Sequence, residues 1–355
     1  MLVRVTQIDG ELPNLALMRL AHYHRANGDE VHVTRRILRD LFEPEYDVVY
    51  GSAIFEFSAE RLARFRAEFP KAVVGGSGTL PGSNGVGNGA TVEQIVGGHI
   101  GVDYSGYPTF AESVGFTQRG CRLKCKFCGV PGKEGKPQPV ASIHDIWRGD
   151  PHPRKVHLLD NDFFGQPESD WRARIDELNA GDFRVCFGQG VNVRLLKDAE
   201  AAALASVQYR DTRFQRRRLY TAWDNLRDER VFFEGVARLE RAGVPPAHLR
   251  VYMLIGFDPL ETWDRLMHRF NRMVALGIEP YPMVYNNRRK DLRAFQRWVV
   301  TGLYRAVPWE EYTGKATASW QPPCNVCGGA TNAAGVCENG DCTGHAGIAL
   351  VERAV

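Results

Sequence analysis

Three cysteines fall within eight residues, after 120 residues that contain none. Cys121, Cys125 and Cys128 are spaced C-x3-C-x2-C in "GFTQRGCRLKCKFCGVP". Thiolates at this spacing on one short loop hold three corners of a 4Fe–4S cluster and leave the fourth iron open. Gly120 and Gly129 let the backbone turn tightly around such a group. The pattern therefore predicts a 4Fe–4S cluster; half of a zinc site and incidental thiols are the alternatives.

A second group of cysteines stands near the C-terminus, in "CNVCGGATNAAGVCENGDC". Its members are Cys324, Cys327, Cys337 and Cys342. Four thiolates close a tetrahedral zinc site, and zinc would stabilise this polar segment, which has too few apolar residues for a core. His345 is an alternative fourth ligand, and a second iron–sulfur cluster is the rival interpretation. Cys186 stands alone in an apolar run and is predicted to be a small core residue.

Composition limits the class of protein. The chain has 355 residues, of which 44% are hydrophobic, so it contains enough apolar side chains for a core. The formal net charge of +3 does not by itself predict a nucleic-acid partner. The sequence shows neither an apolar run long enough to span a membrane nor a signal peptide. We therefore expect a cytoplasmic protein without a membrane partner, in which clustered cysteines bind metal.

Residues 1–104 alternate strand and helix patterns. Expected strands are "LVRVTQI", "EVHVT", "YDVVYGSA" and "KAVVGG", and expected helices are "LALMRLAHYHRANG" and "SAERLARFRAEF". This alternation predicts an α/β domain with a Rossmann-like parallel sheet and crossover helices. The glycine-rich stretch from Gly75 to Gly101 is expected to be a loop.

Residues 105–310 repeat the alternation about six times. Expected strands are "GFTQRG", "KVHLLD", "RVCFGQG", "RRLYTAW", "RVYMLIGF" and "EPYPMVYN", separated by helices such as 168–180, 226–243 and 260–277. Six such units predict a partial (β/α)6 barrel with functional residues at the carboxyl ends of its strands. Residues 318–355 form the predicted zinc-ribbon-like tail.

The stretches "TQRGCRLKCKFC", "DYSGYP" and "LIGFDPLET" resemble the radical S-adenosylmethionine (SAM) superfamily, in the subgroup with an N-terminal cobalamin-binding-type domain. The resemblance covers most of residues 1–290. It implies an enzyme whose open iron chelates the amino and carboxylate groups of SAM. An electron from a reductant such as flavodoxin or ferredoxin then cleaves SAM, and the 5′-deoxyadenosyl radical abstracts hydrogen from a substrate.

The resemblance also implies further cofactor-binding residues. Phe127 matches an aromatic residue beside the adenine, although packing against the barrel is an equal alternative. "LLDNDFFG" ends one strand where family members hold the methionyl amino group, and a plain turn is the alternative. "GQGVNVR" ends the next strand and would address the methionyl carboxylate or the substrate. Asp224 in "TAWDN" binds a ligand or caps a helix. The residues expected from the two quoted stretches are Asp160, Asn161, Asp162, Gln189, Asn192 and Arg194.

Cobalamin is a further candidate cofactor, which one loop disfavours. Cobalamin domains that replace the lower axial base use D-x-H-x-x-G after the first strand, and this chain reads "DGELPN" from Asp9, with Asn14 in place of the glycine. Ser52, Gly75 and Gly76 nevertheless resemble the small residues that admit the nucleotide tail. We therefore expect a domain that keeps the fold without the cofactor.

The substrate stays open between a nucleic-acid base, a peptide and a small metabolite. Two basic stretches, 210–218 and 286–297, each contain a Phe among arginines, which suits phosphate contact and base stacking. A solvated surface is the commoner alternative. Placed outside the barrel mouth, Arg216, Arg217 and Arg218 would hold a polymer. Other candidate functions are a cobalamin-dependent radical methyltransferase, a peptide- or metabolite-modifying radical enzyme, and a non-catalytic iron–sulfur or zinc protein that binds nucleic acid.

Overall fold

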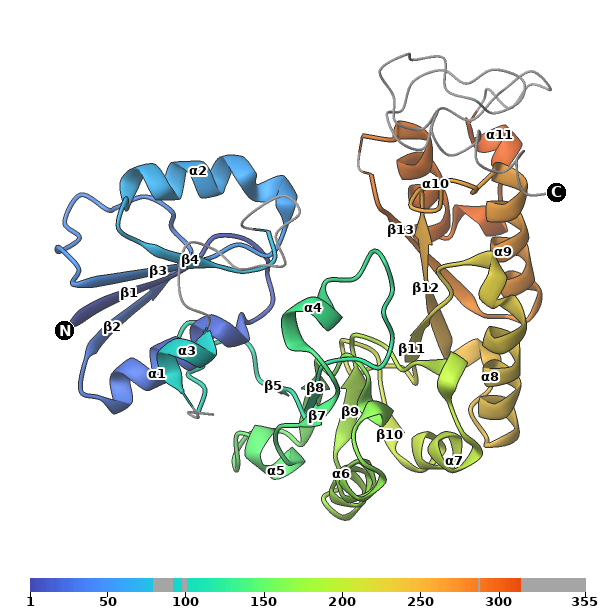
Figure 1. The fold of residues 1–355 in the computed structure, drawn as a ribbon, viewed down its shortest axis with the longest axis horizontal. Helices are drawn as coiled ribbons and strands as arrows, with labels where there is room; N and C mark the ends of the chain where they lie inside the picture. The colour runs from blue at the N-terminus through green and yellow to red at the C-terminus, as the bar shows by residue number, and fades with distance from the viewer. Residues whose placement is uncertain (79–91, 98–100, 287, 314–355) are drawn as a thin grey trace. The chain divides into compact units, whose positions relative to one another are not determined.

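A computed structural model describes residues 1–78, 92–97, 101–286 and 288–313 (Figure 1). The chain forms two compact units, Met1–His157 and Leu158–Val355. The four C-terminal cysteines and the predicted tail 318–355 lie outside the described residues. Their zinc site therefore stays a prediction.

The first unit is an α/β structure built on a parallel sheet. Its elements in order are β1 (Leu2–Gln7), α1 (Leu15–Ala26), β2 (Glu30–Thr34), β3 (Val48–Ser52), α2 (Ala59–Glu68), β4 (Val73–Gly75), α3 (Val92–Val96), β5 (Ser113–Gly115), β6 (Gln118–Arg119), α4 (Val130–Glu134), β7 (Gln138–Pro139), α5 (Ile143–Ile146) and β8 (Lys155–Leu158), whose last residue begins the second unit. The sheet has the order β2-β1-β3-β4 with every pairing parallel. The predicted α/β class with a parallel N-terminal sheet is confirmed.

Both faces of this sheet are covered, with α1 and α3 on one side and α2 on the other (Figure 1). Val3 and Val5 of β1 are fully buried in a cluster with Leu17 and Leu20 of α1. A second cluster packs Phe65 of α2 on the opposite face. β1 alternates the apolar Val3 and Val5 with Arg4 and Thr6, and all four side chains are fully or almost fully buried because both faces of the sheet are covered.

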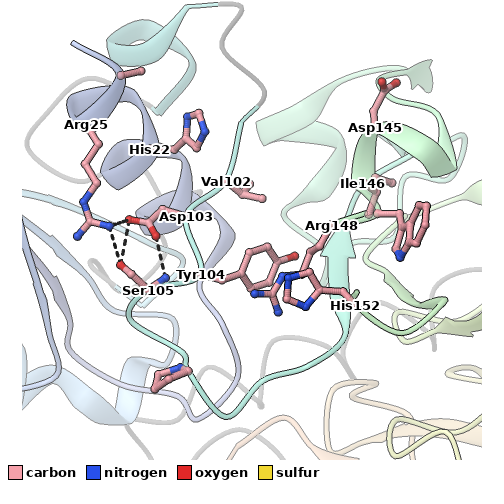
Figure 2. Close-up of a pocket in the computed structure, with 13 residues that line it drawn as sticks. His22, Arg25, Val102, Asp103, Tyr104, Ser105, Asp145, Ile146, Arg148 and His152 are labelled. Atoms are coloured by element: carbon pink, nitrogen blue, oxygen red, sulfur yellow. Dashed lines mark hydrogen bonds and ion pairs between the residues drawn. The ribbon is translucent and has the colours of Figure 1, made fainter. Parts of the chain in front are cut away.

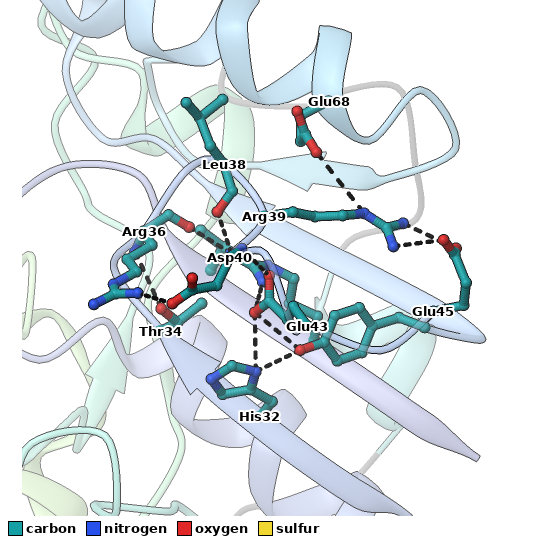
Figure 3. A network of polar contacts seen from close by, with 12 residues as sticks. His32, Thr34, Arg36, Leu38, Arg39, Asp40, Glu43, Glu45 and Glu68 are labelled. Carbon is teal, nitrogen blue, oxygen red and sulfur yellow. Dashed lines mark hydrogen bonds and ion pairs between the residues drawn. The ribbon is translucent and has the colours of Figure 1, made fainter.

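The segment 35–47 between β2 and β3 is held by charged side chains (Figure 3). Arg4 is fully buried, and its guanidinium pairs with Glu43, which also accepts hydrogen bonds from the Asp40 amide (3.1 Å) and the Tyr46 hydroxyl (3.0 Å). The same guanidinium lies over the Phe69 ring, 4.7 Å from its centroid. Burial alone would raise the pKa of Glu43, but these hydrogen bonds and the charge of Arg4 lower it. The segment is therefore anchored by a desolvated ion pair.

We expect Glu43→Gln to lower the free energy of unfolding of this unit by about 3 to 5 kcal/mol, because it leaves the buried Arg4 charge without a partner. Urea denaturation followed by circular dichroism measures the change. Glu45→Gln is the matched control, since the Glu45 side chain is 88% exposed in its pair with Arg39. Equal effects of the two substitutions would contradict the prediction.

Two expectations for this unit are wrong in part. The glycine-rich stretch contains α3, whose Val96 is buried, so helix packing against α1 overrides the local glycine signal. The expected strand "GFTQRG" is divided: β5 ends at Gly115, whereas β6 pairs antiparallel with β7. As a result, β6 precedes the cysteines and β7 follows them, and their pairing closes the loop that carries the cysteines.

The second unit also consists of parallel strands and helices. Its elements in order are α6 (Glu168–Ala180), β9 (Arg184–Phe187), α7 (Asp198–Ser206), β10 (Gln208–Tyr209), β11 (Leu219–Ala222), α8 (Glu229–Arg241), β12 (Leu249–Ile255), α9 (Trp263–Ala275), β13 (Glu279–Val284), α10 (Lys290–Val300) and α11 (Trp309–Thr313). β9 pairs with β10, and β11, β12 and β13 form a sheet in that order, all parallel. Helix α6 has the predicted bounds, whereas the two-residue β10 was not expected.

Alternation along β12 separates the two faces of this sheet. Leu249, Val251, Met253 and Ile255 are fully buried on one face, whereas the residues between them are partly exposed. On that second face the Tyr252 ring lies 5.8 Å from the rings of both Tyr220 on β11 and Tyr281 on β13. These rings lie across the middle of this second face of the sheet, which we call the inner face.

Candidate functional site

The cysteine loop, residues 120–137, is closed at its neck by the β6–β7 pair in the first unit. Gln118 faces Pro139 and Arg119 faces Gln138, and the Val140 amide donates to the Thr117 carbonyl (2.8 Å). The Cys121 amide donates to the Gly135 carbonyl (3.3 Å), which extends these contacts into the loop. The neck is thus fixed by backbone hydrogen bonds, independently of any cluster.

Gly120 is required at this neck. Its φ is +82°, and a Cβ there would lie 2.3 Å from the Lys136 carbonyl oxygen. Glu134 secures the same point, because its carboxylate accepts from the Gly120 amide (3.1 Å) and the Arg119 guanidinium (2.9 Å). The sequence predicts that Gly120 lets the backbone turn around a cluster. In the structure, Gly120 lets the two ends of the cysteine loop approach each other closely.

The three thiols of the loop are partly exposed and form no disulfide. Among the residues described, no three or more His, Cys, Asp or Glu side chains gather closely enough to hold a metal ion. A 4Fe–4S cluster does not need such a group, because each thiolate binds a different iron. Half-buried Phe127 stands between Cys125 and Cys128, as expected from the sequence. The thiols are accessible, and the cluster stays a prediction.

In the second unit, the segment after β9 contacts three neighbouring strands. The Gly188 amide donates to the Leu158 carbonyl at the end of β8 (3.2 Å), and the Val191 amide donates to the Tyr220 carbonyl within β11 (2.8 Å). The Tyr252 hydroxyl, from the middle of β12, donates to the Gly188 carbonyl (3.0 Å). The predicted residues follow β8, β9 and β11, at the carboxyl edge of the strands.

The side chains predicted at this edge differ in accessibility. Asp160 and Asp162 are buried, with 4% and 1% of their surface exposed, whereas Gln189 is exposed. The buried Asn192 Nδ2 has no hydrogen-bond partner among the described residues. A buried amide nitrogen without an acceptor costs free energy unless a ligand or water supplies one. Asn192 is thus the residue that fits a bound polar ligand best.

Arg194 is already paired at this edge. Its guanidinium donates to the Asp228 carboxylate (2.8 Å), and both side chains are about one-fifth exposed. A ligand carboxylate would therefore share Arg194 with Asp228 rather than meet an unpaired cation.

Asp224 lies directly after β11 and is not the helix cap that the sequence left open. Its Oδ1 accepts from the Leu254 amide of β12 (3.1 Å), whereas Asn225 caps the short helical turn that follows. Burial raises the pKa of the Asp224 carboxyl, although the Leu254 hydrogen bond and the positive charge of Arg269 oppose the increase. The site therefore disfavours the charged form of Asp224.

Sequence reasoning missed Arg269 as a support for this edge. Arg269 on α9 is only 1% exposed and donates to the carbonyls of Trp223 and Leu254, each at 3.0 Å. Its guanidinium also pairs with Glu261, which accepts from the Gly256 amide (2.7 Å). The signal was an arginine on the apolar face of α9. Arg269 thereby holds the ends of β11 and β12 on either side of Asp224.

The N-terminal sheet does not fit cobalamin at its carboxyl edge. The Tyr107 hydroxyl donates to Gln7 Oε1 (2.6 Å) and accepts from the Asn14 amide (3.1 Å), and all three residues are buried. Asn14 Nδ2 donates to the Ser52 hydroxyl (2.9 Å), and Asn14 Oδ1 caps α1. The residue in the place of the motif's glycine is therefore part of a closed network.

The two glycines near this edge differ in the space around them. A Cβ on Gly76 would lie 2.1 Å from the Ala53 carbonyl oxygen, so Gly76 is required by the close approach of the loops after β3 and β4. A Cβ on Gly75 would meet no atom within 4 Å, and the Gly75 carbonyl accepts from the Ala53 amide (3.0 Å). The interpretation of these positions as room for a nucleotide tail stays a prediction.

The two basic stretches lie at different ends of the strands. Arg216, Arg217 and Arg218 precede β11, at the end opposite Asp224, and Arg218 pairs with Glu279 at the start of β13 (2.7 Å). The stretch 286–297 follows β13 and continues into α10. The expectation that the first stretch lies outside the mouth with the catalytic residues is therefore wrong.

The phenylalanines of these stretches are not available for base stacking. Phe214 and Phe295 are 5% and 0% exposed. Phe214 packs with Cys186 and Tyr220 on the inner face, and Cys186 is the buried core residue predicted from the sequence. For nucleic-acid binding, these stretches therefore offer arginines for phosphate contact and no exposed phenylalanine for base stacking.

A groove of about 860 Å³ in the first unit is lined by residues of α1, the 102–108 segment and the α5 region (Figure 2). Its arginines already have acceptors in the protein: Arg25 donates to Asp103 and Ser105, and Arg148 donates to the Phe110 carbonyl while it lies over the Tyr104 ring. The groove contains none of the predicted site residues.

Comparisons of the chain with protein-family models, curated proteins and solved structures find no match. No helix in the described part of the chain is sufficiently long and apolar to cross a membrane. Membership of the radical SAM superfamily therefore stays a prediction.

The substitution Asp224→Asn tests whether the buried charge of Asp224 lowers the stability of the folded protein. A raised pKa in the folded state means that stability is lost as pH rises from the unfolded value of 3.8 through the folded pKa. The uncharged asparagine keeps an oxygen for the Leu254 amide. We expect the variant to be more stable than the native protein at neutral pH and to lose this advantage at acidic pH. Urea titrations across pH measure the difference, and a difference independent of pH would contradict the prediction.

The closed N-terminal edge predicts that hydroxocobalamin does not bind with micromolar affinity, because binding there would have to break the hydrogen bonds among Tyr107, Asn14 and Ser52. Equilibrium dialysis with visible absorbance measures binding. Stoichiometric retention of the cofactor would show that this edge opens.

Proposed function

We propose that the chain is a radical SAM enzyme, with residues 105–310 as a partial barrel and Cys121, Cys125 and Cys128 as ligands of a 4Fe–4S cluster. The observation that carries the proposal is the C-x3-C-x2-C loop, whose thiols are partly exposed and whose neck is fixed without them. A fixed neck limits how far the three thiols can spread before the cluster assembles, which reduces the entropy lost on binding.

The cluster, when bound, supplies the electron that cleaves SAM to methionine and a 5′-deoxyadenosyl radical. This chain's own residues would hold SAM and exclude water. Asn192 Nδ2 offers a donor to a carboxylate or ribose oxygen, and buried Asp160 and Asp162 offer acceptors for an ammonium group. Phe127 would lie beside the adenine. Asp224, held by Leu254, would contact SAM or the substrate at the same strand edge.

The substrate class is not fixed by this edge. A reductant such as flavodoxin or ferredoxin would deliver the electron, and the C-terminal cysteines would bind structural zinc. Asp224 at the strand edge is buried and the pKa of its carboxyl is raised, so its charged form lowers the stability of the folded protein. Groups of this kind are typical of active sites, which favours an enzyme over a non-catalytic iron–sulfur protein.

Replacing Cys121, Cys125 or Cys128 by Ala should abolish iron binding at this site and reduce formation of 5′-deoxyadenosine by at least about a thousandfold, since each thiolate holds one iron corner. Iron analysis and chromatography of the reduced protein with SAM measure both effects.

Cys186→Ala is the matched control for these variants. Burial raises the pKa of the Cys186 thiol to about 12, so it is not a thiolate at neutral pH. The control should keep its iron and its activity. Iron and cleavage retained in all three loop variants would refute the cluster assignment.

The zinc assignment is tested by a Cys324→Ser, Cys327→Ser double variant. We expect it to lose one zinc ion while its iron content stays constant, because two of four ligands are gone. Elemental analysis after anaerobic purification measures both metals. Loss of about four irons per chain would instead support a second cluster.

A further inference from the structure

The stretch 210–218 forms a tight turn that is held by hydrogen bonds to Asp211 and by the buried ring of Phe214. The Asp211 amide donates to the Arg216 carbonyl (2.9 Å), and the Asp211 carboxylate accepts from the amides of Arg213 (3.2 Å) and Gln215 (2.8 Å). Phe214, at φ +57°, buries its ring in the cluster with Cys186 and Tyr220. The buried ring fixes the turn against the inner face, and its arginines are left on the outside.

Two guanidinium groups, those of Arg210 and Arg217, contact Tyr209 beside this turn, and the charge of Arg184 acts on Arg210. Arg184 begins β9 and pairs with Gln208 in the β9–β10 register. Arg210 follows Tyr209 and donates to its carbonyl (2.9 Å), and Arg217 lies 5.3 Å from the centre of its ring. We call Arg184, Arg210 and Arg217 the arginine cluster. Its members come from two segments, the start of β9 and the turn 210–218, which the β9–β10 pairing brings together.

The arginine cluster is not neutralised by ion pairs. None of its three guanidiniums forms an ion pair within the described residues. The nearby carboxylate of Asp211 accepts two backbone amides at Oδ1, and its charge opposes the lowering of the pKa of Arg210 only in part. Burial, and then the charges of Arg217 and Arg184, lower the pKa of Arg210. Like charges held together in this way cost free energy that a bound anion would recover.

The arginine cluster lies at the amino ends of the strands, away from the candidate site. At about 3.3 Å per residue, the stretch from Arg218 to Asp224 spans roughly 20 Å. An anion on the cluster is therefore not the reacting group. Buried Phe214 also removes the aromatic ring that stacking on bases would need.

We propose that the arginine cluster is a docking surface for the phosphate groups of a nucleic acid, contacted through the backbone and without base recognition. Guanidinium forks match phosphate oxygens in pairs, and contacts of this kind hold and orient a polymer without reading its sequence. A polymeric anion, unlike a small one, extends from this surface toward the distant strand edge. The inference concerns binding alone and does not depend on the radical chemistry.

Fluorescence anisotropy with a labelled mixed-sequence single-stranded oligonucleotide tests the proposal on the full chain, without SAM or reductant. We expect the triple variant Arg184→Gln, Arg210→Gln, Arg217→Gln to bind at least about tenfold more weakly at low salt. The slope of log affinity against log salt should fall by about 2, because each lost single-strand phosphate contact contributes about 0.7. Circular dichroism checks that the variant is folded, and the single variant Arg217→Gln, on an exposed side chain, should lower the slope by about 0.7.

The matched control carries the same change of charge in the same unit. Arg172→Gln, Arg230→Gln, Arg241→Gln removes three exposed arginines that have carboxylate partners. We expect its affinity and salt slope to stay near those of the native protein. Three results would overturn the proposal: no binding by the native chain at low salt, equal losses in the two triple variants, or displacement of the oligonucleotide by poly-glutamate of matched charge. The last result would indicate an acidic peptide as the partner.

Discussion

Parallel strand pairing is the constraint on which the candidate site depends. Parallel strands end at a common edge, and in the second unit the hydrogen bonds from Gly188, Val191 and Tyr252 connect the segment after β9 with the end of β8 and the middle of β11 and β12. Residues distant in sequence therefore share one edge. Arg269 adds a buried guanidinium between the carbonyls of Trp223, which follows β11, and Leu254 of β12. Since the Leu254 amide donates to Asp224, Arg269 supports the same strand segment that holds the buried carboxyl.

Whether the polar groups already have partners distinguishes the two regions considered as cofactor sites. The cysteine loop is fixed at its neck and accessible at its thiols, whereas the edge of the N-terminal sheet is closed by Tyr107, Asn14 and Ser52. Polar groups that already have partners offer little to a ligand, because binding would have to break those hydrogen bonds first. The polar edge of the parallel N-terminal sheet is thus used within the chain itself.

Much of the fold could be predicted because hydrophobic periodicity reports burial. The pattern of α6 predicted its bounds, and the apolar runs predicted β1 and β12. Single residues with tertiary partners could not be predicted in this way. Phe214 reads as an aromatic among arginines, but its ring is buried, and Arg269 is a buried support on an otherwise amphipathic helix. Their roles depend on contacts between segments, which periodicity does not encode.

The position of the arginines was misjudged for a related reason. The sequence showed a basic run before an expected strand, and the direction of that strand decides which end the run occupies. Since β11 begins at Leu219, its preceding arginines stand at the amino end, away from Asp224. Strand direction was thus available in the sequence, whereas the gathering of Arg184 with Arg217 required the β9–β10 pairing.

The central claim is that the cysteine loop holds a 4Fe–4S cluster with one open iron that binds SAM. Electron paramagnetic resonance of the chemically reduced protein tests it most directly. The account predicts the signal of a single reduced 4Fe–4S cluster whose g-values change when SAM is added, because the methionyl amino and carboxylate groups enter the coordination of the open iron. A reduced protein without a cluster signal, or with a signal that SAM leaves unchanged, would contradict it.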